Sequence, residues 1–550
     1  MRSIKNFLKH NFLFFTLSIF SVLPLIDLLH PGLPVTHDGR DHVARIANFY
    51  QNLAEGNLVP RWAGNLNWGY GHPVLMFLYP LPSYLGSLFH FLGLSFVDST
   101  KLVFAFSFVA SILTMYLWLR QFLSKKAAVV GGLLYGYAPY HFVDLYVRGA
   151  IGEMAAFIFP PLVCYFMYKL SQKNTYQYLL GGAFSLAGFI LAHNAVSLMF
   201  LPMLGLYAIY LFWQSKNRRS LLLVFCSVLF FGFSLSAFFW APAFLEGRYT
   251  LRDIVIEGVT QSRFVSFSDL VYGNWNYGQS GEFTVQVGML QWLGVLFSVI
   301  VLLQYFKKRE YERWLILGLL FVFIGSLVIM LPLSQLVWDN ISILQKFQFP
   351  WRFLFVTMFS AAVLGAYGFS FFPKRLQTIG LIIFIIMLVF TTKDMWYAKT
   401  YVERPERFYT DVFHSTTDTG ESAPIWSVRF MEKTPSAPIE IIGGEGKVTI
   451  LNRTTTKHEY EVITDERMQL RENTLYFPGW EVFIDNKPVT IEFQDQNNRG
   501  VMTFFVEPGT HTITVLFTET KLRFGANVIS IVSLFVLIFF GIFRKKVWQN

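Results

Sequence analysis

The chain has 550 residues, of which 54% are hydrophobic, 18% aromatic and only 15% charged. Soluble globular domains carry about 25% charged residues, so this composition excludes an ordinary soluble protein and predicts a polytopic membrane protein. The net charge of +10 does not indicate nucleic-acid binding, because most Lys and Arg stand in short clusters between apolar runs. Both cysteines, Cys164 and Cys226, lie inside apolar runs, which argues against a disulfide framework or a cysteine-based metal site.

About 12 apolar runs approach the ~20 residues that a helix needs to cross a bilayer. The first follows a basic N-terminus without a small-residue cleavage site, which is typical of an uncleaved signal-anchor helix. The predicted spans are 11–29, 102–122, 127–143, 153–170, 177–193, 195–214, 220–243, 285–305, 312–332, 350–372, 376–392 and 524–543. A further apolar stretch, 74–94, is broken by Pro80 and Pro82, which favours a re-entrant or interfacial segment over a spanning one.

The basic clusters predict the topology. If 74–94 does not cross, every basic cluster between spans falls on the cytoplasmic side of the cell membrane, together with both termini. These clusters are Lys125/Lys126, Lys169/Lys173, Lys216/Arg218/Arg219, Lys307/Lys308/Arg309, Lys374/Arg375 and Arg544/Lys545/Lys546. The first outer loop, 30–73, and the long segment 393–521 then share the outer face, where nearly all candidate polar residues gather.

Segment 393–521 differs in composition from the rest of the chain. Its strand-like runs alternate polar and apolar residues and are separated by Asp-Asn and Pro-Gly turns, a pattern typical of an antiparallel β-sandwich. We therefore predict a transmembrane domain over 1–392, an extracytoplasmic β-sandwich domain over 393–521, and a C-terminal helix with a basic tail over 522–550.

The first outer loop carries an acidic cluster directly after the first span. Carboxylates so close to a membrane helix are unfavourable unless they serve a function. Asp38 is interpreted as a general base held above the membrane, and the alternative is a turn residue. Asp41 is a second catalytic candidate, or else the N-cap of an amphipathic helix over 42–54 that lies along the bilayer surface. His37, Asp38, Asp41 and His42 could also hold a divalent cation such as Mg²⁺ or Mn²⁺.

A second polar constellation runs from Asp144 to Glu153 between two spans. Arg148 and Glu153 flank a turn with glycines at 149 and 152, which would let the backbone approach a ligand. The alternative is a short helical hairpin with an Arg–Glu surface pair of little energetic weight. The residues leave both interpretations open.

A third group combines Gln348 with Arg352 at the entry to an apolar span. A guanidinium fork suits phosphate binding, and Arg248 in the 244–284 loop could act in the same way. The alternative for Arg352 is a side chain that snorkels to the lipid headgroups. His193 and Asn194 lie between two spans, where a helix break is the more common role for such a pair.

No nucleotide-binding glycine loop, zinc motif or Ser-His-Asp order appears in the sequence. Since the predicted cytoplasmic loops are short and merely basic, a soluble activated donor is not expected, and a transferase of this kind would take its donor from a lipid carrier.

At the level of motifs, the outer loop with Asp38 and its helix resembles the GT-C superfamily of membrane glycosyltransferases. Four further segments resemble the YfhO-like membrane proteins and the related family labelled 6-pyruvoyl-tetrahydropterin-synthase-related, a label that implies no pterin chemistry. These segments are 148–153, 236–242, 349–352 and 476–488. One departure is that many GT-C members carry adjacent acidic residues, whereas Asp38 and Asp41 are separated.

The resemblance implies transfer of a sugar from a polyprenyl-phosphate carrier to an extracytoplasmic hydroxyl of an envelope glycan, lipid or protein. The expected catalytic residues are Asp38 and Asp41. The expected ligands of the donor phosphate are Arg148, Arg248 and Arg352. The expected substrate-binding residues are His37, His42, Glu153, His193, Asn194 and Gln348. Two alternatives remain at this stage, namely a transporter of a lipid-linked sugar or envelope polymer, and a non-catalytic scaffold that binds envelope glycans.

Overall fold

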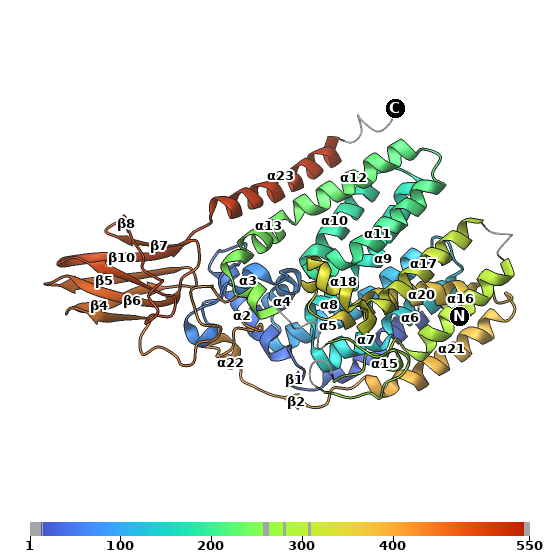
Figure 1. The fold of residues 1–550 in the computed structure, drawn as a ribbon, viewed down its shortest axis with the longest axis horizontal. Helices are drawn as coiled ribbons and strands as arrows, with labels where there is room; N and C mark the ends of the chain where they lie inside the picture. Colours follow the sequence, from blue (N-terminus) through green and yellow to red (C-terminus); the bar gives the residue numbers. More distant parts are fainter. Residues whose placement is uncertain (1–12, 14, 257–262, 279–281, 306–309, 544–550) are drawn as a thin grey trace, which may run out of the picture.

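The computed structural model describes residues 13, 15–256, 263–278, 282–305 and 310–543. Figure 1 shows a bundle of helices joined at one end to a β-sheet domain, with helix α23 (Lys521–Phe543) running back along the bundle from that domain. The fold class is therefore confirmed: an α-helical protein of membrane type that carries a β-sheet domain before its last helix.

The helices before the sheet domain differ widely in length. A 3₁₀ helix over Leu23–Leu29 precedes them, and a π-helical turn over Val143–Arg148 separates α7 from α8. In chain order they are α2 (Gly39–Ala54), α3 (Val74–Phe77), α4 (Leu81–Phe91), α5 (Phe96–Leu119), α6 (Lys125–Gly136), α7 (Pro139–Phe142), α8 (Ile151–Ala156), α9 (Phe159–Gln172), α10 (Tyr176–Ala192), α11 (Asn194–Gln214), α12 (Arg218–Leu235), α13 (Ala237–Leu245), α14 (Arg252–Ile256), α15 (Phe267–Val271), α16 (Met289–Tyr305), α17 (Glu310–Val328), α18 (Gln335–Asn340), α19 (Ser342–Gln345), α20 (Leu354–Ser370), α21 (Gln377–Thr392) and α22 (Arg407–Thr410).

Seven helices of the described chain are long and apolar enough to cross a membrane, or eight if the bent pair Glu312–Val328 and Pro332–Asn340 forms one span. Three further apolar helices are shorter, over Phe15–Leu29, Tyr176–Ala192 and Met289–Gln304. The predicted span 127–143 is divided, because α6 ends at Gly136 before Pro139.

The stretch 74–94 forms two short helices, α3 and α4, separated at Leu78. With 11 residues, α4 is about 16 Å long, roughly half the thickness of a bilayer core. It packs against α2 and α5 rather than standing alone. That 74–94 is re-entrant or interfacial stays a prediction.

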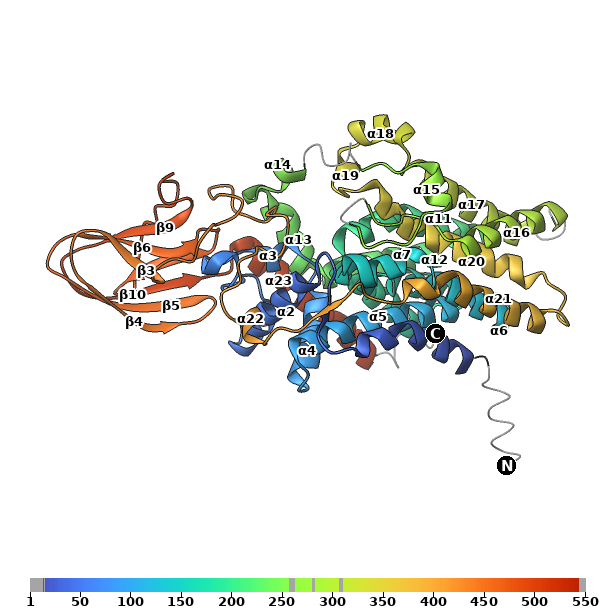
Figure 2. The same cartoon turned by 90° about the horizontal axis from the view of Figure 1, so that it is seen from below.

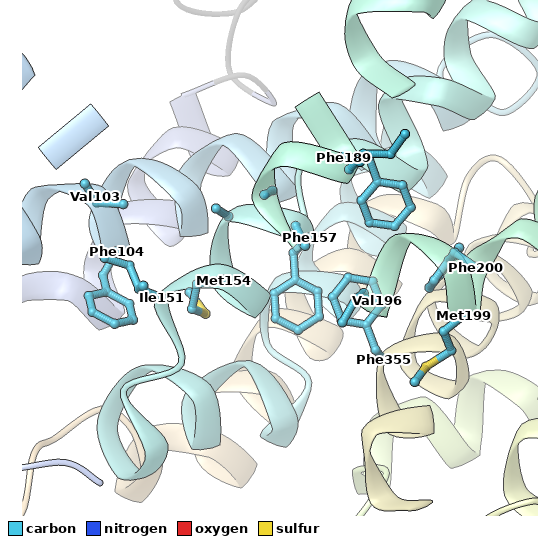
Figure 3. Packing of buried hydrophobic residues seen from close by; sticks show 14 of the residues in the cluster. Val103, Phe104, Ile151, Met154, Phe157, Phe189, Val196, Met199, Phe200 and Phe355 are labelled. Atoms are coloured by element: carbon cyan, nitrogen blue, oxygen red, sulfur yellow. The ribbon is translucent and has the colours of Figure 1, made fainter. Parts of the chain in front are cut away.

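Aromatic side chains fill the core of the bundle (Figure 3). Phe157 stacks on Phe355 with ring centroids 4.1 Å apart, and Phe200 meets Phe355 edge-on at 5.2 Å. These rings come from the region after α8, from α11 and from α20, so the contacts join helices that are far apart in the sequence. This packing holds the polar ends of α8, α11 and α20 close to one another.

Helix α2 differs from the predicted surface helix. The apolar residues Val43, Ile46 and Ala47 are buried as expected, but Arg45 and Asn48 on the other face are buried as well. Figure 2 shows α2 lying close to both α4 and α22, and α2 contacts both helices. The predicted amphipathic helix is therefore present, but the segment after α21 covers part of its polar face.

The sheet domain consists of two antiparallel sheets with orders β4-β5-β10-β7-β8 and β3-β6-β9. Apolar side chains such as Val462, Val515 and Phe504 are buried between them, as expected of a sandwich. The strands are β3 (Ile439–Gly443), β4 (Lys447–Arg453), β5 (Lys457–Thr464), β6 (Met468–Leu475), β7 (Trp480–Ile484), β8 (Lys487–Val489), β9 (Val501–Val506) and β10 (Gly509–Phe517).

Residues 393–438 precede these strands and take a different course. Strand β2 (Tyr401–Val402) pairs with β1 (Leu33–Pro34) of the first outer loop, and the chain then passes through α22 into a mostly irregular segment. This segment lies over α2 and supplies part of the candidate site. The sandwich strands themselves begin at Ile439.

The base of α23 ties the sandwich to the bundle. The fully buried Arg523 donates from Nε to Glu246 at 2.7 Å and from Nη2 to the carbonyl of Pro478 at 2.6 Å. Arg61 donates from Nε to Glu519 at 2.8 Å and from Nη2 to Asn527 at 2.9 Å. Charge-assisted hydrogen bonds of this kind fix the sandwich relative to the helices.

Candidate functional site

The first outer loop presents Asp38 at the start of α2. The helix begins at Gly39, whose N–H donates to Oγ1 of Thr36 at 3.1 Å, so Asp38 takes the N-cap position without making a capping bond. Its carboxylate is left exposed. Asp41 lies inside the first turn, so the interpretation of Asp41 as the cap of this helix is wrong.

Backbone hydrogen bonds bring this loop against the Arg148 turn. The N–H of His37 donates to the carbonyl of Val147 at 3.0 Å, and that of Asp38 donates to the carbonyl of Arg148 at 2.9 Å. Gly149 makes the approach feasible, since its φ is +66° and a Cβ there would stand 2.2 Å from Oγ1 of Thr36. Two constellations that are separate in the sequence therefore form one site.

Asp38 lies within the field of several cations. Water reaches its carboxylate, yet protein atoms surround it, and this loss of solvent raises its pKa against the opposing charges of Arg148 and Arg45. Burial also raises the pKa of Asp41, again against Arg45. Both carboxylates thus lie in a partly desolvated, cationic environment, where a proton acceptor is held at a defined place.

Arg148 is the centre of a buried ion network. It pairs with Asp144 on its own turn and donates from Nη2 to Oε1 of Glu153 at 2.8 Å. Arg352 donates from Nε to the same Glu153 oxygen at 3.2 Å, and the hydroxyl of Tyr140 donates to the other at 2.5 Å. Two guanidinium groups and two carboxylates balance in charge, as buried ions require. The alternative of an exposed Arg–Glu surface pair is therefore wrong.

Arg352 connects this network to the segment after α21. Its Nη1 donates to Oε1 of Gln348 at 3.0 Å, and Nε2 of Gln348 donates to Oε2 of Glu421 at 2.7 Å. Burial and the nearby charge of Asp418 raise the pKa of Glu421 to about 7, against Arg352. Arg352 is mostly buried in this chain of contacts, so it is more than a side chain that snorkels to the headgroups.

A short loop, residues 415–422, covers the site next to α2. We call it the site loop. Arg45 donates from Nη2 to the carbonyl of Thr417 and from Nε to its hydroxyl at 3.4 Å. His72 and Asp418 form a buried pair at 3.5 Å. Asp418 also accepts from the N–H groups of Gly420 and Ser422 at 2.8 and 3.0 Å, which fixes the turn that carries Glu421.

His42 and His37 hydrogen-bond to neighbouring protein groups at the site. Nη1 of Arg45 lies 2.9 Å from Nδ1 of His42, so this nitrogen accepts, and burial together with Arg45 holds the pKa of His42 well below its usual range. His37 contacts the carbonyl of Gly278 through Nε2 at 2.8 Å. Within the part of the chain that the structure describes, no group of three or more His, Cys, Asp or Glu side chains is arranged to hold a metal ion.

His193 acts as a helix cap beside the ion network. Its Nδ1 accepts from the N–H of Val196 at 3.3 Å at the start of α11, and its ring stacks on Tyr79 with centroids 4.7 Å apart. Asn194 accepts from the N–H of Ala195 at 3.0 Å through its own Oδ1. Both residues border the site, and their contacts are those of a helix break.

Arg248 lies apart from the cluster. It is exposed on a 3₁₀ turn over Glu246–Tyr249, where it donates to the hydroxyl of Tyr249 at 2.8 Å. The sequence analysis missed Arg45, Thr417, Asp418 and Glu421, which the structure places in the site. Arg45 could have been included from the sequence, because it is a charged residue in the helix that was expected to follow Asp38.

The chain is similar to one curated protein over part of its length. An uncharacterized protein of Lactococcus lactis subsp. cremoris (strain MG1363) is 25% identical over 329 residues, which are 57% of this chain and 53% of that protein. The matched region thus spans about half the length of that relative.

Several solved structures are similar at low identity. The arabinofuranosyltransferase AftD from mycobacteria matches with 14% identity and a TM-score of 0.48 over 69% of this chain and 26% of that one. ArnT from Cupriavidus metallidurans, solved with undecaprenyl phosphate, matches with 15% identity and a TM-score of 0.39 over 72% and 67% of the two chains. The Archaeoglobus fulgidus oligosaccharyltransferase, in complex with Zn and sulfate, matches with 14% identity and a TM-score of 0.41 over 74% of this chain and 58% of that one.

The model of one protein family matches residues 75–402, more than half of the chain. This range includes the Arg148 turn, the ion network and the Arg352 turn, and it ends at β2. The expectation drawn from the motifs is confirmed: the chain belongs to the family described as the 6-pyruvoyl-tetrahydropterin synthase related domain, a membrane protein.

Proposed function

We propose that the protein is a membrane glycosyltransferase that moves a sugar from a polyprenyl-phosphate carrier to an acceptor hydroxyl on the outer face of the cell membrane. The observation that carries the proposal is the position of Asp38. An exposed carboxylate stands at the start of α2, in the fields of Arg45, Arg148 and Arg352. One group can accept a proton there while cations stabilise a departing phosphate.

In the proposed reaction, Asp38 accepts the proton of the acceptor hydroxyl as that oxygen attacks the anomeric carbon. The bond between the anomeric carbon and the phosphate oxygen breaks, and its electron pair passes to the phosphate. The transition state is oxocarbenium-like, as in glycoside hydrolysis, and a single displacement inverts the configuration. Asp41 lies one helical turn from Asp38, and the charge of Asp38 adds to burial in raising the pKa of Asp41.

Among the three predicted phosphate ligands, Arg352 is the best placed. Arg148 already has two carboxylate partners, and its guanidinium lies 4.6 Å from the ring centre of Trp351. Arg352 donates to Glu153, to the carbonyl of Phe347 and to Gln348 through Nε and Nη1, which leaves its Nη2, among the described contacts, for a phosphate oxygen. Arg45, bound to His42 and to the neutral Thr417, supplies a second cation.

The position of the polar residues favours transfer over transport. Arg148 ends a π-helical turn, Glu153 lies in the first turn of α8, and Arg352 lies in the turn before α20. All three therefore stand at helix ends, next to the segment that leads to the sandwich. A transport pathway would need such groups halfway through the bundle.

Exposed apolar residues on α4, which packs against α2, suit the lipid part of the donor. Leu88, Phe91 and Leu92 at the end of α4 are exposed, and α4 packs on α2, whose first turn carries Asp41. We propose that the broken segment α3–α4 and helix α2 form the entry for the polyprenyl chain. The sandwich would then cover the site.

The test uses the full chain purified in detergent. Wild type and Asp38→Asn are incubated with a panel of polyprenyl-phosphate sugars, with and without added Mg²⁺ or Mn²⁺, and release of free polyprenyl phosphate is measured. Release by wild type and not by the variant supports the proposal, and the responding sugar identifies the donor. If wild type releases no lipid phosphate from any donor, or the variant equals it, the proposed reaction is refuted.

A further inference from the structure

A cavity lies beside the candidate site, and none of its lining residues has a role in the reaction as described above. Its volume is about 340 Å³, and it opens between the first turn of α2 and the segment around α22. The lining residues are Arg40, Pro405, Arg407, Phe408, Asp411, Val412, Phe413, His414 and Ser415. It is large enough for one or two sugar units, since ligand pockets begin at roughly 300 Å³.

The charge of the cavity is positive. Arg40 and Arg407 both line it, and Asp411 is the one acidic residue among its lining side chains. Neither guanidinium forms an ion pair with a carboxylate that the structure describes, and both side chains are exposed. The first turn of α2, which carries Arg40, adds the positive end of a 16-residue helix. These groups together favour an anionic ligand.

The walls of the cavity are aromatic. The ring of Phe413 is buried, and Arg40 lies over it with Cζ 5.7 Å from the ring centre. His414 stacks on Trp68 with ring centroids 3.9 Å apart, and Phe408 meets Phe413 edge-on at 5.8 Å. Flat apolar surfaces with a few convergent polar groups are typical of sites for small polar molecules, and they keep the cations at defined places.

The cavity adjoins the candidate site at Ser415. This residue lines the cavity, and its hydroxyl contacts the carboxyl of Asp41. Asp41 in turn lies in the first turn of α2 next to Asp38. A molecule held in the cavity would therefore extend along this turn toward the exposed Asp38 carboxylate.

We infer that this cavity binds the acceptor of the reaction, and that the acceptor is a saccharide bearing an anionic group, a phosphate ester or a carboxylate. The anionic group contacts Arg40 and Arg407, and the sugar ring packs on the aromatic wall. The neighbouring hydroxyl of the acceptor then reaches Asp38. The role of the bound saccharide as an acceptor rests on the proposed function. The preference of the cavity for an anionic saccharide can be measured independently of it.

The experiment measures binding to the full chain in detergent by titration calorimetry with three matched probes: cellobiose, cellobiouronic acid and cellobiose 6′-phosphate. We expect at least one anionic probe to bind about tenfold more tightly than cellobiose at low salt, as two charge-assisted contacts allow. The difference should shrink at high salt because the cavity is open to solvent. If phosphate alone is preferred, the acceptor is a phosphorylated saccharide; if the uronate is preferred, it is an acidic sugar.

Substitutions in the cavity test which residues cause the preference for an anionic probe. Arg407→Gln and Arg40→Gln should each lower the preference for the anionic probe by about two- to fivefold, the scale of an exposed ion contact. Arg404→Gln is the matched control, because Arg404 is exposed on the same segment, 5.5 Å from the ring centre of Phe408, and does not line the cavity. Equal binding of all three probes, or an equal loss in Arg404→Gln, would overturn the inference.

Two outcomes separate this inference from the proposed function. Asp38→Asn should bind the anionic probe like wild type while losing transfer. If wild type shows the charge preference and never transfers a sugar, the proposed function fails and the binding site remains. If it transfers sugar to neutral acceptors with no charge preference, the proposed function stands and this inference fails.

Discussion

The backbone N–H of Asp38 donates to the backbone carbonyl of Arg148 at 2.9 Å, and this bond joins two outer segments that the sequence separates by several apolar helices. It fixes the candidate base relative to the ion network of Arg148, Glu153 and Arg352. Because the bond is between main-chain atoms, the geometry is set by the fold of the two turns and does not depend on the side chains. The first two predictions concern this relationship.

Substitution Asp38→Asn should lower turnover by about 10²–10⁴-fold, the usual contribution of a positioned general base. The amide keeps the size of the side chain, and the carboxylate makes no capping bond that would be lost, so folding should be unaffected. Release of polyprenyl phosphate is the measurement. Asp339→Asn, in an exposed position on α18, is the control and should leave turnover unchanged.

Substitution Gly149→Ala should destabilise the protein by roughly 1–3 kcal/mol, because φ is +66° there and the new Cβ would stand 2.2 Å from Oγ1 of Thr36. Thermal unfolding in detergent measures the loss. Turnover should also fall, since Thr36 positions the start of α2. Gly205→Ala is the matched control: it is helical and has no atom within 4 Å of the added Cβ. An equal effect of the two substitutions would contradict this account of the turn.

Donor binding should weaken as pH rises through about 7, the pKa of Glu421. Below that pH the carboxyl is neutral. Above it, a negative charge lies beside Gln348 and Arg352 and competes with the donor phosphate. The KM for the donor should therefore rise on the alkaline side in wild type, and Glu421→Gln should remove this rise. Glu432→Gln, at an exposed position, should keep the wild-type profile.

The same group makes a prediction for stability. The folded-state pKa of Glu421 lies above its usual value of 4.5, so the folded state holds this proton more tightly than the unfolded state. Its contribution to stability is present below about 4.5 and is lost as pH rises to about 7. Thermal unfolding of wild type and Glu421→Gln across this window should converge at low pH and separate at high pH, with wild type the less stable.

The three predicted phosphate-binding arginines should respond differently to substitution by Gln. Arg352→Gln should raise the KM for the donor about 10- to 100-fold, as expected for a charge-assisted hydrogen bond of about 1.5–3 kcal/mol. Arg248→Gln should change nothing, because Arg248 lies outside the cluster. Arg148→Gln should instead destabilise the fold by about 3–5 kcal/mol, since it leaves Asp144 and Glu153 buried with one cation. Steady-state kinetics with thermal unfolding distinguishes these outcomes.

Much of the fold could be predicted from local patterns. Hydropathy identifies long apolar helices such as α5 and α11, and period-two alternation identifies β5 and β10, because each pattern reflects the burial of one short segment. The position of helix ends was less accurate: α2 begins at Gly39, where Thr36 rather than Asp41 accepts the first free N–H. The first residue of α2 depends on the conformation of the turn before it. The apolar periodicity of the helix contains no information about that turn.

The site was only partly predictable. Asp38, Arg148, Glu153, Gln348 and Arg352 stood out because polar groups next to apolar spans are unfavourable without a purpose. Glu421 and Thr417 gave no comparable signal, since they lie in an irregular segment rich in Ser, Thr and Gly that reads as a surface loop. Irregular segments have no period, so nothing local indicates what they contact.

The sequence by itself determined the class of the protein, the apolar helices, the β-sheet domain and the group of polar residues expected on one face, because each of these follows from the transfer free energy of neighbouring residues. Only the tertiary structure decided that Asp38 meets Arg148, that Arg45 is buried under the site loop, and that Glu421 reaches Arg352 through Gln348. These contacts join residues far apart in the chain, and they depend on how the packed helices place their ends and on which loop covers them.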